Sequence, residues 1–419
     1  MVRWFVFLAL LGFGLNIPHA FAQFSFDRIS DYEGYGIERP VKFWTTPRYN
    51  RVEGLFVNPG LEYYPTPWPN TKFYGYIGAG LWNESDQIFR FRVGARKDFM
   101  ADEFTRRFSL GAEVFHSVQS VDDWTVGYLE NSLYALVAGQ DYKDYFSATG
   151  FKVYFDYKLK EAHTLRFELA RRKFEALRKN IDWSVFGKAF PANPRRADAF
   201  IAEGNEIGLR FIAAFDWRDN PVFPLTGWYL EAIYEPTFED FKTQGLFLTL
   251  KAYRPTWSNQ RLLARVMLGT RSGDIAGPRA SGAPVDSLAD QYAIDLGGLG
   301  TLRGFDDKEF MGNRMFMLNF NYWFGGDILQ KIPLRNVPLF GTFWSTLSLG
   351  LFVDTGWAWV SDPDRFLLDG FGALRPANLK TDVGVSLAVL EGVVRLDVAK
   401  RTDRSRDDFR VTLRILEKM

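Results

Sequence analysis

One arginine stands among glycines in the stretch GGLGTLRGFDDKEF at 297–310. The stretch follows a run rich in Gly, Ser and Asp and precedes the strand-like run RMFMLNFNYWF. A glycine-rich loop that binds phosphate usually leads into a helix whose N-terminus receives the anion, and no helical pattern follows here. A phosphate-binding loop is therefore not favoured, and an isolated arginine on a loop is most often a solvated surface charge.

Other residues with catalytic or metal-binding chemistry are scarce. The chain has no cysteine, which excludes disulfides and thiolate chemistry, and only three histidines. His116 and His163 lack metal-ligand spacing, and no G-x-S-x-G motif accompanies them to support a serine hydrolase. We therefore expect no enzyme activity, no metal site and no cofactor.

The first residues have the pattern of an export signal. A positive MVR start, the apolar run WFVFLALLGFGLNI and the cleavage site AFA follow one another. The apolar run is shorter than the ~20 residues of a membrane-spanning helix. We predict a secretory signal peptide over 1–22, with the mature chain beginning at Gln23; the alternative is an uncleaved membrane anchor.

Apolar and charged residues are finely interleaved. Aromatic residues make up 17% of the chain, yet 24% of the residues are charged and the mean hydropathy is only -0.16. Lysine and arginine (51) balance aspartate and glutamate (50), which argues against a polyanionic partner such as nucleic acid.

The interleaving has a period of two residues. In GLFLTLKAYR at 245–254, Leu246, Leu248 and Leu250 share one face, and Thr249 and Lys251 share the other. This alternation predicts a β-strand, and it recurs at 89–96, 165–171, 261–271, 393–400 and 409–415.

Two architectures use such strands. A soluble β-sandwich buries the apolar face, whereas an outer-membrane barrel turns it to lipid and lines its lumen with polar groups. The export signal, the aromatic strand-length runs and the scarcity of helical periodicity favour an all-β fold, a transmembrane antiparallel β-barrel surrounded by outer-membrane lipid.

About sixteen runs have strand character, and an even number suits a barrel. They lie near 52–65, 71–82, 87–98, 105–118, 145–158, 163–175, 181–190, 206–217, 226–237, 243–254, 261–271, 314–324, 346–358, 380–390, 392–400 and 407–416. Residues 122–142 instead have apolar residues at helical spacing, which predicts a short helix on a loop that covers the barrel end. Residues 23–50 are too few to bury a core of their own. We expect an N-terminal arm there, in the periplasm or the lumen, and the barrel over 51–419.

Three motifs in order resemble those of the Omp85 superfamily of outer-membrane barrels, which includes BamA-like and TamA-like proteins. They are WRDNPVFPLTGW at 217–228, TLRGF at 301–305 and LFVDTGW at 351–357. The resemblance implies that the long loop around 301–305 folds back into the lumen.

The resemblance also implies roles for particular residues. Arg303, Gly304 and Phe305 would anchor the lumen loop, with Arg303 paired to Asp354 on the wall. Alternation independently places Asp354 on one face with Phe352. We predict that the 217–228 motif forms a tight periplasmic turn, built from Arg218, Asp219, Asn220, Pro221, Pro224 and Gly227.

A barrel needs a seam where its first and last strands meet. We expect the run at 52–65 to be the first strand, and it holds Gly54, Pro59 and Gly60. Proline has no N–H to donate to a ladder, so closure against 409–415 should be weak. In the resembled family, this junction is where lateral opening occurs.

The arm is too short for the POTRA domains that receive clients in the resembled family, so a separate periplasmic partner would have to replace them. Three functions stay open. They are translocation or membrane insertion of polypeptide or lipid through the lumen or the seam, a passive pore gated by the lumen loop, and a barrel scaffold for an outer-membrane enzyme or adhesin.

Overall fold

The computed structural model describes residues 40–82, 89–102, 105–160, 162–187, 189–196, 199–221, 224–257, 260–275, 288–324, 347–389, 394–404 and 409–415. The predicted signal peptide and most of the predicted arm lie outside these residues. Within them, eighteen strands form one sheet and two short strands form another.

The strands of the large sheet are β1 (Val41–Thr45), β2 (Arg48–Asn50), β3 (Gly54–Val57), β4 (Pro59–Tyr63), β5 (Thr71–Leu81), β6 (Phe89–Asp102), β7 (Arg106–Gln119), β8 (Phe146–Leu159), β9 (His163–Ala176), β10 (Gly204–Asp216), β11 (Gly227–Glu239), β12 (Thr243–Pro255), β13 (Arg261–Gly273), β16 (Arg314–Phe324), β17 (Ser348–Trp359), β18 (Lys380–Val389), β19 (Val394–Arg401) and β20 (Phe409–Ile415). The small sheet pairs β14 (Ile294–Leu296) with β15 (Phe310–Gly312). The helical segments are η1 (Asp122–Trp124), α4 (Tyr128–Ala138), η3 (Phe371–Ala373) and η4 (Pro376–Asn378).

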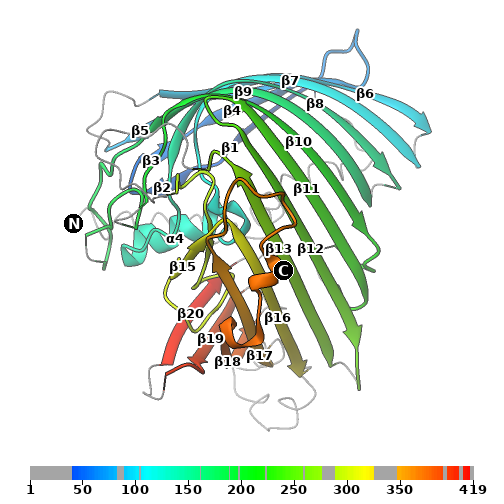
Figure 1. The fold of residues 1–419 in the computed structure, drawn as a ribbon. Helices are drawn as coiled ribbons and strands as arrows, with labels where there is room; N and C mark the ends of the chain where they lie inside the picture. The colour runs from blue at the N-terminus through cyan, green and yellow to red at the C-terminus, as the bar shows by residue number, and fades with distance from the viewer. Residues whose placement is uncertain are drawn as a thin grey trace, which may run out of the picture.

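The large sheet is antiparallel throughout its ladders. From β5 to β13, each strand pairs with the next one along the chain, and β13 then pairs with β16, which leads on to β20. Figure 1 shows this single sheet curving round on itself, with α4 at the open side between β2 and β20. A sandwich would need two packed sheets, and the fold is instead an antiparallel β-barrel.

We call each element that spans the barrel wall a stave, whether it is one strand or two short strands in line. The first two staves each consist of two short strands. β1 pairs with β4 and β2 with β3 in one continuous register, and β3 and β4 both pair with β5. Thr46 and Asn58 bridge the break: the Thr46 N–H donates to Asn58 Oδ1 (3.0 Å), and Asn58 Nδ2 donates to Thr46 Oγ1 (2.8 Å). Counted as staves, the strands in the described part of the chain number sixteen.

That number agrees with the one predicted from the sequence, but two individual assignments were wrong: one predicted strand is not a strand, and one strand was not predicted. Residues 181–190 form no strand, because Ile181, Val185 and Phe190 pack against Tyr49 and against Leu136 of α4. Residues 41–50, which we assigned to the arm, form β1 and β2. The sheet therefore begins before residue 51.

Burial along the strands is inverted relative to a water-soluble protein. On β17, Asp354 is 0% exposed, whereas its neighbours Leu351 and Val353 are 47% and 41% exposed. β20 repeats the pattern, with Arg414 buried and Val411 exposed. An apolar exterior around a polar interior is the arrangement that a lipid surround requires. In the described part of the chain, no helix has the length and apolar character needed to cross a bilayer.

The expected seam was wrong. Gly54 pairs with Asn50, and Pro59 lies opposite Thr45. Gly60 stands between β1 and β5, so all three residues belong to the second stave. The error follows from the missed first strand. In the described residues, β20 forms a ladder with β19 alone, and the edge that faces it across the junction belongs to β1 and β2.

Candidate functional site

The glycine-rich stretch connects β14 to β15 as a tight loop inside the barrel. Gly297, Gly298 and Gly300 have φ angles of +120°, +78° and +80°, which residues other than glycine rarely adopt. Leu302 and Phe305 are fully buried in an apolar cluster with Met267, Ile294, Leu296, Met315, Met317 and Ala358. The loop is therefore packed against the barrel wall.

The wall presents a row of polar side chains at this place. Asn319 of β16 pairs in register with Asp354 of β17, which in turn pairs with Asp382 of β18. Because all three lie on inward positions of adjacent strands, their side chains share one level of the lumen wall.

Arg303 is bonded to this row through a buried bidentate pair. Its Nε lies 2.6 Å from Asp354 Oδ2 and its Nη2 lies 2.8 Å from Asp354 Oδ1. Nη2 also donates to Asn321 Oδ1 at 2.9 Å, and the guanidinium lies 3.4 Å from the centre of the Phe352 ring. With Arg303 5% and Asp354 0% exposed, water is largely excluded from the contact.

Neighbouring groups complete the contact. Asn319 Nδ2 donates to Asp354 Oδ1 and to the Thr301 carbonyl, both at 2.8 Å. The N–H of Gly304 donates to Asp382 Oδ2 at 3.0 Å. A Cβ on Gly304 would lie 2.7 Å from the Asp382 Cβ, which is closer than such atoms approach one another. Glycine is therefore required where the loop meets the wall.

The structure thus brings together Arg303, Gly304, Phe305 and Asp354, which the sequence motifs had singled out. The sequence reasoning missed Asn319, Asn321, Asp382 and Asp397, which lies 3.7 Å from Arg303. Their signal was present, because each is a polar residue at an alternate position of a strand-like run. The role of these residues as an anchor stays a prediction.

A second buried contact holds the other end of the loop. Lys308 Nζ lies 2.6 Å from Asp144 Oδ2, 3.0 Å from Asp122 and 3.4 Å from Asp295. Asp144 also accepts a hydrogen bond from Arg51 Nη2 at 2.6 Å. The lumen loop is thereby tied to the connection between β7 and β8, which we call the helical connection (residues 120–145).

Negative charge is in excess around Lys308. Burial raises the pKa of Asp295 to about 6, against the opposing effect of Lys308. Burial also raises the pKa of Asp290 well above its usual value. Neither carboxylate oxygen of Asp290 has a hydrogen-bond partner within the described residues. This cluster is therefore sensitive to protonation.

The 217–228 motif forms a capped turn between β10 and β11. Arg218 Nη2 lies 2.6 Å from Asp216 Oδ2, and Gly227 has a φ of +115°. Asp219 Oδ1 accepts N–H groups from Asn220, Leu225 and Thr226 at 3.0–3.1 Å. Pro221 and Pro224 lie within this turn, and the motif lies apart from the Arg303 site.

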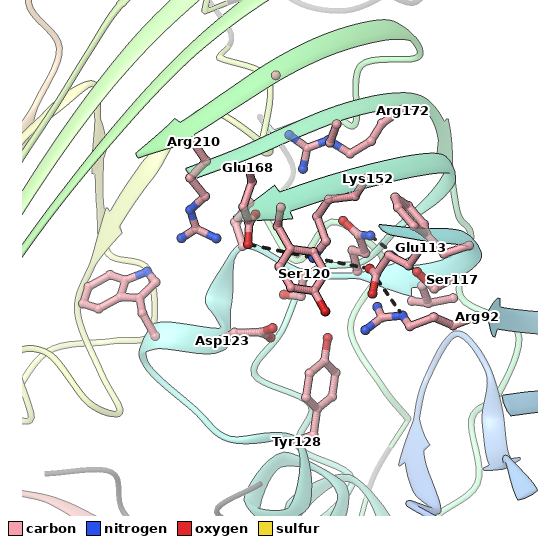
Figure 2. A pocket seen from close by; sticks show the side chains of 18 of the residues that line it. Arg92, Glu113, Ser117, Ser120, Asp123, Tyr128, Lys152, Glu168, Arg172 and Arg210 are labelled. Atoms are coloured by element: carbon pink, nitrogen blue, oxygen red, sulfur yellow. Dashed lines mark hydrogen bonds and ion pairs between the residues drawn. The ribbon is translucent and has the colours of Figure 1, made fainter. Parts of the chain in front are cut away.

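The lumen beside the loop is hollow. A cavity of about 1380 Å³ is lined by residues of β1, β2, β4, β5 to β13, β14 and β16 and by part of the helical connection. Figure 2 shows ion pairs along its wall: Glu113 lies 3.3 Å from Lys152 and 3.9 Å from Arg92. Tyr74 Oη also donates to Glu113 at 3.0 Å. The described residues contain no group of His, Cys, Asp and Glu that could hold a metal ion.

Comparison with known proteins identifies the family. Residues 90–413 match the model of the Omp85 superfamily domain, and the chain belongs to this superfamily. No curated protein matches.

Among solved structures, BamA from Haemophilus ducreyi lacking POTRA domains 1–3 is similar, with 12% identity and a TM-score of 0.54 over 90% of this chain and 69% of that chain. CdiB from Escherichia coli also matches, with 12% identity and a TM-score of 0.38 over 90% of this chain and 62% of that chain. At such identities, the likeness to BamA is one of fold.

Proposed function

We propose that the protein resides in the bacterial outer membrane and moves or inserts a polypeptide or lipid through its lumen or the junction between its first and last strands. One observation carries the proposal: no ladder joins β20 to β1 or β2 in the described residues, whereas ladders join every other pair of neighbouring staves. Opening this junction therefore breaks no ladder between β20 and the first stave.

Other features support the proposal. The apolar exterior fits a lipid surround, and membership of the Omp85 superfamily and the fold of BamA agree with a role in translocation or insertion. The predicted signal peptide would provide export. A separate periplasmic partner would deliver the client.

A passive pore is the second candidate, and the lumen cavity favours it. The cavity is lined by charged and apolar side chains and is large enough for water and small solutes, and the loop around Arg303 would form its constriction. Under this function, the junction would stay closed while solutes pass.

Locking the junction separates the two functions. Phe43 of β1 and Leu413 of β20 are both exposed, so Phe43→Cys with Leu413→Cys replaces no buried side chain. The pair would be bridged with bis-maleimide reagents of graded length, in protein reconstituted into lipid vesicles. We expect the bridge to abolish folding of a urea-denatured outer-membrane barrel into the vesicles and to leave conductance in planar bilayers unchanged.

The matched control bridges two strands that are already paired. Leu396 of β19 lies directly opposite Leu413, so Leu396→Cys with Leu413→Cys should form a disulfide without affecting either assay. Full insertion activity with the junction bridged would refute the lateral route and favour the pore.

A further inference from the structure

Helix α4 occupies the junction between the first and last strands. In Figure 1, α4 lies between β2 and β20, although it belongs to the connection between β7 and β8. Gly127 enters the helix in an extended conformation, and Gly139 ends it with a φ of +68°. The helix is therefore bounded at both ends and presents a fixed face to each strand edge.

On one side, α4 contacts the edge of the first stave. The backbone N–H of Tyr49 on β2 donates to Ser132 Oγ of α4 at 3.0 Å. The Tyr49 ring is buried with Ala135 and Leu136 of the same helix. A side-chain oxygen of α4 thus takes the place of a ladder acceptor for β2.

On the other side, α4 contacts the edge of the last stave. Glu130 accepts hydrogen bonds from Arg414 Nε (2.7 Å) and Nη2 (3.0 Å), and also from the backbone N–H of Ile415 on β20 (2.9 Å). Both Glu130 and Arg414 are buried. Two residues that are two positions apart on one helix, Glu130 and Ser132, therefore accept edge N–H groups from the two strands that a closed barrel would pair with each other.

The two sides of the helix are held differently. On the first-stave side, Arg51 is fully buried and binds the helical connection a second time. Its backbone N–H donates to Asp141 Oδ2 (2.9 Å). Its side chain donates from Nη2 to Asp144 Oδ1 (2.6 Å) and from Nη1 to the Lys143 carbonyl (2.6 Å). On the β20 side, Glu130 binds Arg414 and Ile415, and Arg414 also donates to the Thr125 carbonyl at 3.2 Å.

We propose that α4 is an autoinhibitory latch on the strand junction. It holds the junction shut through Glu130, and opening consists of its release from β20 while it stays bound to the first stave. This regulation rests on the proposed function. Loss of one charged hydrogen-bond partner should raise the released population roughly ten- to hundredfold.

The test measures the separation of α4 from each edge in protein reconstituted into lipid vesicles. Spin labels on Val137→Cys of α4 and Phe409→Cys of β20, both exposed positions, report the β20 side by pulsed electron paramagnetic resonance. A second pair, Val137→Cys with Phe43→Cys, reports the first-stave side. Glu130→Gln and, independently, Arg414→Gln should add a longer-distance population to the first pair and leave the second pair unchanged.

Two further variants test the geometry. Ser132→Ala removes an acceptor on the side that stays bound, so it should leave the first pair of labels unchanged. The charge-exchanged variant Glu130→Arg with Arg414→Glu should restore part of the short-distance population. Unchanged distances in both folded single variants, or release from β2 rather than from β20, would overturn the latch.

These distances need no client, so they remain informative if the proposed insertion activity proves wrong. Conversely, a bridged junction that abolishes insertion, together with a Glu130→Gln variant whose α4 stays on β20, would leave the proposed function standing and remove the latch.

Discussion

At the scale of single residues, the Arg303–Asp354 contact is an ion pair in a place that excludes water. The bidentate geometry and the donation from Asn319 satisfy both oxygens of Asp354. Removing one member of such a pair strands the other charge, and this is costlier than replacing both members together.

Arg303→Ala and Asp354→Ala should therefore each lower the free energy of unfolding by about 3–5 kcal/mol, and the double variant should lose less than the sum. The measurement is urea unfolding in lipid vesicles followed by tryptophan fluorescence. Arg365→Ala is the control, because its pair with Asp362 is exposed and should contribute about 0–1 kcal/mol. Additive effects of the two substitutions would mean that Arg303 and Asp354 are not coupled.

The sequence predicted this pair because each member sits in a short motif and Asp354 follows strand alternation. It did not predict the contacts of Lys308 with Asp122 and Asp144, which lie 186 and 164 residues away on another connection. Alternation fixes which face of a strand a side chain occupies. It does not indicate which loops contact one another inside the barrel. The Lys308 contacts could therefore be found only from the structure.

At the scale of elements, most staves followed from alternation, and the first stave was missed for a physical reason. β1 and β2 are five and three residues long, and the break between them contains Pro47. Neither half is long enough to show a period. Residues 181–190 do alternate, but their apolar side chains are buried under α4 rather than turned to lipid.

The break in the first two staves makes Asn58 important. Asn58→Ala removes both bonds to Thr46 and leaves the Thr46 N–H without its acceptor, so it should lower the free energy of unfolding by about 1–3 kcal/mol. The same unfolding assay measures the effect. Asn378→Ala, at an exposed amide that bonds the Ala373 carbonyl, should change little, and equal effects at both sites would show that the bridge does not stabilise the staves.

At the scale of the whole molecule, Lys308 joins the lumen loop to the helical connection, and through Asp144 and Arg51 to the tip of the first hairpin. Three parts of the chain that are distant in sequence are therefore fastened at one buried cluster. The four carboxyl groups around Lys308, those of Asp122, Asp144, Asp290 and Asp295, outnumber the two cations Lys308 and Arg51, which makes the cluster respond to pH.

The direction of the pH response follows from the raised pKa of Asp295, about 6 in the folded protein against ~3.9 for a free side chain. The folded state binds the extra proton, so this contribution to stability is full below about pH 4 and is lost as pH rises through 6. Asp290, whose pKa is also raised by burial, acts in the same direction.

We expect the unfolding free energy of the wild type, relative to Asp295→Asn, to fall between pH 4 and pH 6 and then to level off. Unfolding at a series of pH values measures the difference, since the amide does not titrate. A constant difference across this range would show that Asp295 titrates normally.

The burial of Arg51 also bears on the order in which the protein acquires its structure. This residue, at the tip of the first hairpin, is bound by groups from residues 141–144 and 192–193, and one of these groups, Asp144, is also bound by Lys308. Contacts so distant along the chain form late, because each must close a long loop. The earliest-synthesised hairpin of the barrel should thus be among the last parts to become rigid, and amide hydrogens of β2 and β3 should gain protection from exchange after those of β7 to β13 when refolding is followed in time.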